Sequence, residues 1–357
     1  MIYLLLFAGL FMGWSLGTND AANAFGTAVA TRVIKYRTAV IIIAVLVVVG
    51  AFTGGANNIG KVAELATSNK VTATAAEVYE AIEEGEEEKL RFRSALKAAI
   101  IFICAGLTVF GMSWLKFPVS ANQSITGAII GWGLFHANYA DPDVLAVNLP
   151  QIGKFAATWV LNPMGAGLIS FVLVWIVNKF FRQKLNSLNG YDMFIKIGYL
   201  LSGAFASYSI GLNSSANVTA LYYDATYAQT GVAANLLTNA QLTATIGGIA
   251  IAVGVLTYSK KVMMTVGSNI ASISQLDGFL VIIGMALTVV IMGSWMGIPV
   301  STSQAVVGAV IGAGLVKGVD NIHFSILKRI ALAWVSSPTV AGLMTYLVAV
   351  ATQGYFA

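Results

Sequence analysis

Residues 17–23 read GTNDAAN, and residues 211–217 read GLNSSAN. Two further motifs return in the same order: PVSANQS at 118–124 returns as PVSTSQA at 299–305, and TWVLNPMGAG at 158–167 returns as AWVSSPTVAG at 333–342. Three ordered pairs indicate an internal repeat much more strongly than any single pair does. We therefore expect two copies of one structural unit, residues 1–190 and residues 191–357.

The composition predicts a membrane protein. Hydrophobic residues make up 57% and charged residues 10% of the 357 positions, whereas soluble domains usually carry about 25% charged residues. Charge-free blocks such as residues 41–49 and 100–109, extended to about 20 residues, are typical of membrane-spanning helices. The net charge of +5 comes from Lys and Arg at the ends of such blocks, which favours membrane orientation over nucleic-acid binding. We expect an all-α, multi-pass protein of the inner or plasma membrane, embedded in the lipid bilayer.

The basic residues predict the orientation of the chain. They cluster near residues 32–37, 179–196 and 260–261, which should face the cytoplasm, while the loops near 136–150 and 222–240 carry none and should lie outside. This gives five crossings per copy and places both termini outside, and an odd number of crossings inverts the second copy. The predicted crossings are 2–31, 36–54, 95–115, 119–135, 152–180, 193–221, 240–258, 277–297, 299–316 and 325–350.

Several features predict interruptions of these helices. Unpaired backbone groups are costly in lipid, so a break at membrane depth marks a cavity lined by protein. Glycine, Asn and Asp are typical of helix ends and predict breaks at mid-membrane near residues 17–20 and 211–214. If the segments around Pro163 and Pro338 each form two half-helices, the number of predicted transmembrane segments rises from ten to twelve. Residues 55–93 form a hydrophilic insertion whose part at 77–93 is predicted to be a solvated loop helix.

Asp20 is an acidic residue in an otherwise uncharged apolar segment. A charge at that depth costs on the order of 3 kcal/mol unless it is neutralised. We expect Na⁺ or a proton to neutralise it, with Asn19 and Asn23 completing an oxygen shell that suits a hard cation. The alternative is that Asp20 caps a following half-helix. The second copy offers equivalent cation-binding residues: Asn213, Ser214 and Asn217.

The two PVS motifs predict an anion site. Proline fits the first turn of a helix and Ser caps it, so each motif should begin a helix whose free N–H groups and dipole attract an anion. The side chains that would bind a tetrahedral oxyanion, together with Asp20, are Ser120, Asn122, Gln123, Ser124, Ser301, Thr302, Ser303 and Gln304. Neither motif holds a cationic side chain that would bind the oxyanion too tightly, so the anion can be released. The alternative is polar packing between helices.

The sequence gives no support to an enzyme or a nucleotide-driven pump. Cys104 is the only cysteine, and His136 and His323 are far apart, which argues against a cysteine- or histidine-based metal site. Residues 55–62, GANNIGKV, nearly match a phosphate-binding P-loop, but position 62 is Val and the stretch follows an apolar helix instead of a strand. We therefore expect no cofactor and transport driven by an ion gradient.

GTNDAAN with its second copy and the paired PVS motifs resemble the PiT family of inorganic phosphate transporters over nearly all of the chain outside residues 55–93. The resemblance implies an inverted-repeat fold with external termini and phosphate uptake coupled to Na⁺ or H⁺. It also implies that Asn19, Asp20 and Asn23 bind the coupling ion and help hold phosphate, while the PVS motifs cradle phosphate.

The chain departs from the family pattern at Ser214, where the family usually carries an acid, and at Ala121 and Asn122, where Ser or Thr is usual. These departures keep sulfate or thiosulfate as an alternative cargo, and an anion channel with the same breaks as an alternative mechanism. The choice between Na⁺ and H⁺, and between a monomer and a homodimer, stays open.

Overall fold

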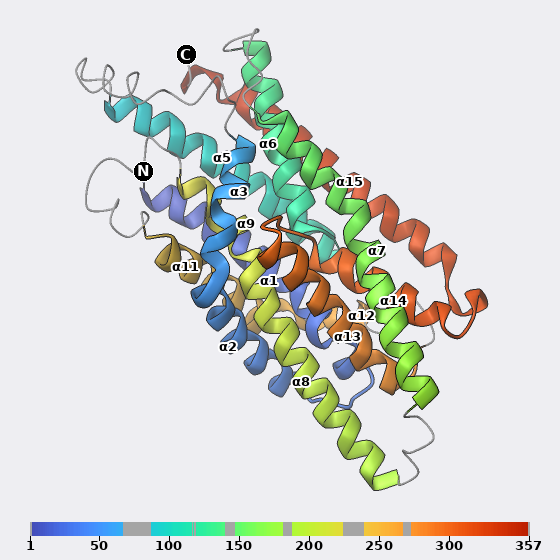
Figure 1. Cartoon of the computed structure of the whole chain (residues 1–357). Helices are drawn as coiled ribbons and strands as arrows, with labels where there is room; N and C mark the ends of the chain where they lie inside the picture. Colours follow the sequence, from blue (N-terminus) through green and yellow to red (C-terminus); the bar gives the residue numbers. More distant parts are fainter. Residues whose placement is uncertain are drawn as a thin grey trace.

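The computed structural model describes residues 2–66, 87–115, 117, 119–139, 147–180, 188–223, 239–266 and 273–355. Throughout these ranges the chain forms a bundle of helices and no strands (Figure 1). The elements are α1 (Ile2–Ala30), α2 (Tyr36–Gly54), η1 (Gly55–Asn58), α3 (Ile59–Ala63), η2 (Glu64–Ala66), α5 (Glu87–Trp114), α6 (Ala121–Tyr139), α7 (Leu149–Phe180), α8 (Leu188–Ser214), α9 (Ala216–Thr219), η4 (Ala220–Tyr223), α11 (Ala240–Tyr258), α12 (Lys260–Val266), α13 (Gln275–Val289), the π-helical η5 (Val290–Trp295), α14 (Thr302–Leu315), η6 (Val319–Asn321), α15 (Phe324–Ala351) and η7 (Gln353–Tyr355).

The all-helical membrane fold predicted from the sequence is confirmed. Within the described residues, seven helical segments are long and apolar enough to cross a membrane. Each predicted crossing corresponds to a helix, and two of them, residues 36–54 and 240–258, coincide with α2 and α11. The start of α1 and the end of α15 lie at one end of the bundle, and the end of α7 and the start of α8 lie at the other end (Figure 1), as an even total of crossings requires.

Helices of the first copy pack on helices of the second copy in pairs that are related by exchanging the two copies. α1 packs on α11 while α2 packs on α8, and α6 packs on α15 while α7 packs on α14. Glycines make each pair of contacts close: a side chain at Gly17 would meet the carbonyl of Ile251, and one at Gly211 would meet the carbonyl of Val47. Each of these helix contacts therefore has an equivalent contact in which the two copies have changed places, as an approximate two-fold relation requires. The boundary between the copies at residues 190 and 191 stays a prediction.

The helices that begin at the PVS motifs, α6 and α14, pack in the same reciprocal way on the proline-containing helices α15 and α7. A side chain at Gly127 of α6 would meet the backbone of Pro338, and one at Gly308 of α14 would meet the backbone of Pro163. These four residues occupy matching places in the repeated motifs. Glycine is required at such places because only a residue without Cβ permits backbone to lie on backbone.

The predicted break in the first signature helix is wrong. α1 runs without interruption from Ile2 to Ala30 and passes through residues 17–20. Gly17 serves close packing on α11 instead of a helix end. The second predicted break is confirmed, because α8 ends at Ser214 and α9 begins at Ala216.

The prolines do not divide α7 and α15 into half-helices. Both helices are continuous, with Pro163 and Pro338 in their interiors. Proline removes the hydrogen bond that the carbonyl four residues earlier would accept. For Pro338 that carbonyl belongs to Trp334, and the Ser337 hydroxyl donates to it at 3.4 Å. Neighbouring polar groups thus allow the helix to continue in lipid.

Each PVS motif lies at the tip of a helical hairpin inside the bundle. α14 has 14 residues, about 21 Å of helix, against a hydrocarbon thickness of about 30 Å. α14 alone is therefore shorter than a full crossing, and the predicted crossing at residues 299–316, which includes the extended residues before α14, stays a prediction. Asp277 at the start of α13 and Lys317 just after α14 form an ion pair of 2.6 Å, so the two arms of this hairpin end at the same level.

The insertion at 55–93 is described only in part. Its first residues form η1, α3 and η2, and residues 87–93 already belong to α5, which begins before the predicted start at residue 95. The remaining residues of the predicted loop helix, 77–86, lie outside the described residues, as do residues 140–146 and 224–238 of the two predicted external loops.

Candidate functional site

The first signature motif presents one polar face of α1 to the interior. Asn19, Asp20 and Asn23 are at most 4% exposed. Positions 19 and 23 are four residues apart, and positions 20 and 23 are three apart, so the side chains share one face of the helix. The unbroken helix therefore positions all three without the discontinuity expected from the sequence.

Asn23 joins this face to the second PVS motif. Its Nδ2 donates to Thr302 Oγ1 at 3.1 Å and to Ser303 Oγ at 3.0 Å. The same atom donates to Asp20 Oδ1 at 3.2 Å. The contacts to Thr302 and Ser303 connect residues 279 and 280 positions apart and hold the start of α14 against the middle of α1.

Asp20 connects both signature motifs. Its carboxylate lies close to the side-chain hydroxyls of Thr302 and Ser214. Ser214 is the residue that occupies the equivalent of Asp20 in the second copy, so the two equivalent positions meet. One carboxylate thus lies where the two copies face each other.

Asn19 joins the same site to both hairpins. Its Nδ2 donates to Ser113 Oγ at 2.9 Å and to the Phe117 carbonyl at 3.3 Å. Ser113 lies near the end of α5 and Phe117 between α5 and α6, the two arms of the first hairpin. Its Oδ1 accepts from Ser303 Oγ of the second hairpin at 3.4 Å. Ser113 is a residue that the sequence analysis missed, because it lies outside the repeated motifs.

The two PVS motifs begin their helices in the same way. Ser120 Oγ accepts from Gln123 N, and Ser301 Oγ accepts from Gln304 N, each at 3.2 Å. These are N-caps, which leave other first-turn N–H groups directed out of the helix. Both serines are buried, and Pro118 lies outside the described residues. The predicted helix starts at the PVS motifs are confirmed, and they supply two helix dipoles that favour an anion.

Several buried amide atoms of the motifs have no hydrogen-bond partner among the described residues. They are Nδ2 and Oδ1 of Asn122, Oε1 of Gln123 and Oε1 of Gln304. A buried polar group left unpaired costs about 1–3 kcal/mol. These amides therefore suit a polar occupant beside the helix starts.

The other predicted residues have protein partners or lie beside the site. Both amide atoms of Asn213 bond the backbone of Val300, at 2.7 and 2.9 Å. Ser124 Oγ donates to the Ser120 carbonyl at 3.2 Å within its own helix. Asn217 is buried with its Oδ1 unpaired among the described residues. Asn213 thus holds the tip of the second hairpin in place.

Asn162 is a second residue that the sequence analysis missed. It is fully buried, and its Nδ2 donates at 2.7 Å to the carbonyl of Ser301, the N-cap of α14. The signal was present in the sequence, because Asn162 is an amide in an apolar segment within the TWVLNPMGAG motif.

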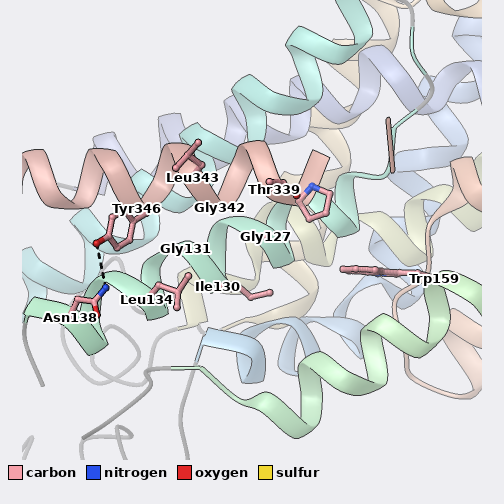
Figure 2. Close-up of a pocket in the computed structure, with 11 residues that line it drawn as sticks. Gly127, Ile130, Gly131, Leu134, Asn138, Trp159, Thr339, Gly342, Leu343 and Tyr346 are labelled. Carbon is pink, nitrogen blue, oxygen red and sulfur yellow. Dashed lines mark hydrogen bonds between the residues drawn. The ribbon is translucent and has the colours of Figure 1, made fainter. Parts of the chain in front are cut away.

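A groove of about 610 Å³ lies apart from this polar site, between α6, α7 and α15 (Figure 2). Its lining is apolar, with Gly127, Gly131 and Gly342 along its floor. Asn138 donates to Tyr346 Oη at 3.3 Å at one end of the groove, and Trp159 lies at the other end. The apolar lining gives no place for an inorganic ion.

Comparison with known proteins identifies the family. The model of the phosphate transporter family matches residues 16–345. The chain belongs to this family. A relative from Pyrococcus abyssi, named as a phosphate permease, is 27% identical, and the match covers 97% of this chain and 96% of the relative. The sulfate permease of Bacillus subtilis is 28% identical, and its match covers 95% of this chain and 84% of the permease.

The solved structure of another protein has the same fold as this chain. It is that of a sodium-dependent phosphate transporter, with a TM-score of 0.74 and 23% identity, and the match covers 98% of each chain. The family, the fold and the apolar helices make the chain a multi-pass membrane transport protein.

Proposed function

We propose that this protein imports inorganic phosphate by symport with Na⁺. The observation that carries the proposal is the position of Asp20, which lies close to Ser214 of the other copy and to Thr302 at the buried, N-capped start of α14. Family membership and the name of the Pyrococcus abyssi relative support phosphate as the cargo. The name of the sodium-dependent structural neighbour supports Na⁺ as the coupling ion.

Phosphate binds between the starts of α6 and α14. First-turn N–H groups and the amides of Asn122, Gln123 and Gln304 donate to its oxygens, together with the hydroxyls of Thr302 and Ser303. All of these donors are neutral, so the helix dipoles supply the attraction and the anion can still leave. Ser120 and Ser301 cap the helices and keep their N–H groups in place.

Na⁺ binds at Asp20 with the amide oxygens of Asn19 and Asn23. A bare carboxylate repels an oxyanion that lies a few ångströms away, and a cation bound to the carboxylate removes this repulsion. Each ligand therefore binds better when the other is present, which is the reciprocal coupling that symport needs. Ser214 brings the second copy to the same ion through its contact with Asp20.

Uptake into proteoliposomes tests this proposal. Radiolabelled phosphate should accumulate when Na⁺ is high outside, and should not accumulate when a K⁺ or a proton gradient replaces the Na⁺ gradient. Accumulation under a proton gradient alone would show that the coupling ion is H⁺. Equilibration without accumulation under every gradient would indicate a channel and would overturn symport.

Sulfate is the second candidate cargo, because one relative is a sulfate permease and because Ser214 replaces an acid. Hydrogen phosphate has a proton to donate, whereas sulfate at neutral pH can only accept. The unpaired oxygens of Asn122, Gln123 and Gln304 are acceptors, which favours the protonated anion. A competition assay at pH 7 distinguishes the two cargoes. Strong inhibition of uptake by sulfate and none by phosphate would show that sulfate, and not phosphate, is the cargo.

A further inference from the structure

The apolar groove of about 610 Å³ between α6, α7 and α15 has an equivalent in the other copy. A groove of about 380 Å³ lies between α7 and α14. Gly127 and Gly131 line the first groove, and Gly308 and Gly312 line the second. Each pair follows the proline of its PVS motif by the same number of residues, so the repeat produces both grooves.

The two grooves differ at one end. In the first groove Asn138 Nδ2 donates to Tyr346 Oη at 3.3 Å (Figure 2). Counted from the prolines of the repeated motifs, the second copy has Val319 and Phe171 at these places. Helix packing therefore does not require the polar pair, because a valine and a phenylalanine take its place in the other copy.

The polar pair marks the end of the groove at the membrane surface. Asn138 is the last residue but one of α6, and Tyr346 lies in the last two turns of α15. The end of α15 lies at the same end of the bundle as the start of α1 (Figure 1). From Asn138 to Gly127 the groove follows eleven residues of α6, about 17 Å of helix. Half of the hydrocarbon thickness is about 15 Å, so the groove reaches the middle of the membrane.

The groove opens toward the lipid. Two of its walls are α7 and α15, the least buried of the seven apolar helical segments within the described residues. Leu134 and Leu343 on its lining are 49% and 57% exposed. In a membrane such side chains contact acyl chains, because the bilayer core holds no water. Of the described residues, none that lines the groove is charged.

The width of the groove selects between a lipid chain and a helix of a second copy. A volume of about 610 Å³ spread over about 17 Å gives a mean cross-section of roughly 36 Å², which is about 6 Å across. An α-helix with its side chains is about 10 Å wide. The groove is therefore too narrow to admit a helix and wide enough for a single extended chain.

We propose that this groove binds one acyl chain of a phospholipid of the outer leaflet, whose headgroup hydrogen-bonds Asn138 and Tyr346. The apolar lining accepts the chain, the length of the groove matches one leaflet, and the polar pair lies at the level where a headgroup begins. Tyrosine is typical of that level. The uncharged lining favours a zwitterionic headgroup, that of phosphatidylethanolamine, over an anionic one. The outer leaflet follows from the expected external position of both termini.

Native mass spectrometry of the purified protein tests the site. The protein in detergent is titrated with phosphatidylethanolamine or with anionic phosphatidylglycerol, and the bound lipids are counted by mass. The wild type should bind one phosphatidylethanolamine more tightly than any further lipid and more tightly than phosphatidylglycerol. Asn138→Val and Tyr346→Phe, which introduce the residues of the second copy, should each weaken this binding roughly two- to tenfold, the scale of one lost hydrogen bond.

A variant that fills the groove tests the place of the chain. Leu343→Trp should abolish the tight binding. Leu168 occupies the equivalent place in the second groove, so Leu168→Trp is the matched control and should leave it unchanged. Wild-type binding in all three variants of the first groove would overturn the proposal, as would equal binding of the two lipids. A dimer that Leu343→Trp dissociates would show that the groove is an interface between copies and would also overturn it.

The fluorescence of Trp159 gives an independent readout. Trp159 lies at the deep end of the groove (Figure 2). One equivalent of phosphatidylethanolamine brominated near the ends of its acyl chains should quench a larger fraction of the fluorescence in the wild type than in Trp159→Phe. Equal fractions would show that no chain reaches the deep end and would contradict the proposal. Neither measurement involves transport, so a failure here leaves the proposed symport intact, and a failure of symport leaves the lipid site testable.

Discussion

At the scale of single residues, the site depends on one carboxylate held by neutral partners. Asp20 accepts from Asn23 and lies close to the hydroxyls of Thr302 and Ser214. The partners are uncharged, so the charge of Asp20 is the property that the cation recognises. The shape of the site depends on hydrogen bonds that an amide could largely reproduce.

Asp20→Asn should therefore abolish Na⁺-dependent phosphate uptake and leave the protein folded. The amide keeps the shape of the carboxylate and removes the charge that attracts Na⁺. Uptake at different Na⁺ concentrations, with size-exclusion profiles as the control for folding, checks this expectation. A variant that retained the wild-type Na⁺ dependence would contradict the assigned role of Asp20.

Asn162 is expected to act through the geometry of the second helix start. Asn162→Ala removes the 2.7 Å bond to the Ser301 carbonyl. A neutral hydrogen bond contributes about 0.5–1.5 kcal/mol net, which corresponds to a rise in the KM for phosphate of roughly two- to tenfold at little change in kcat.

The matched control is Ser337→Ala at the equivalent place in α15. The Ser337 hydroxyl bonds within its own helix, so this change should leave the KM for phosphate near the wild-type value. Equal effects of the two substitutions would contradict a specific role for Asn162.

At the scale of secondary-structure elements, the hairpin of α13 and α14 is closed at its base by an ion pair. Asp277 is 1% and Lys317 25% exposed at the side chain, and their N···O distance is 2.6 Å. Ser274 also donates to Asp277 Oδ2 at 2.7 Å and caps α13. The base is therefore fixed while the tip carries the PVS motif.

Replacement of Lys317 should destabilise the protein more than replacement of Asp277. Lys317→Met leaves a buried carboxylate without its cation, which costs on the order of a few kcal/mol. Asp277→Asn keeps the cap and leaves a lysine that can turn toward solvent. Thermal unfolding should show a larger loss of stability for Lys317→Met, and the double variant should recover part of it. A loss that is equal in both single variants would contradict the asymmetric burial.

At the scale of the whole molecule, the exchanged contacts and the common end of the termini fit an inverted pair (Figure 1). We expect tags at either terminus to be accessible from outside the cell and residues 260–261 to be accessible from the cytoplasm. Labelling of single introduced cysteines in a Cys104→Ala background measures this. Termini found on opposite sides of the membrane would contradict the inverted arrangement.

The sequence by itself determined the class of fold and the bounds of most helices, and it predicts the repeat and the chemistry of the signature residues. These features depend on local hydrophobicity and on motifs that occur twice, such as Asn19 with Asn213 and Ser120 with Ser301. The positions of α2 and α11 followed directly, because apolar length alone defines a spanning helix in lipid.

Only the tertiary structure decided whether each helix continues or breaks. Gly17 could mark a helix end or a close contact, and the carbonyl of Ile251 on a distant helix makes it a contact. Asn23 meets Thr302 across 279 positions of sequence, so its partners satisfy the polar face without a break. The place of the PVS motifs within the bundle also depends on which helices meet, and no local pattern carries that information.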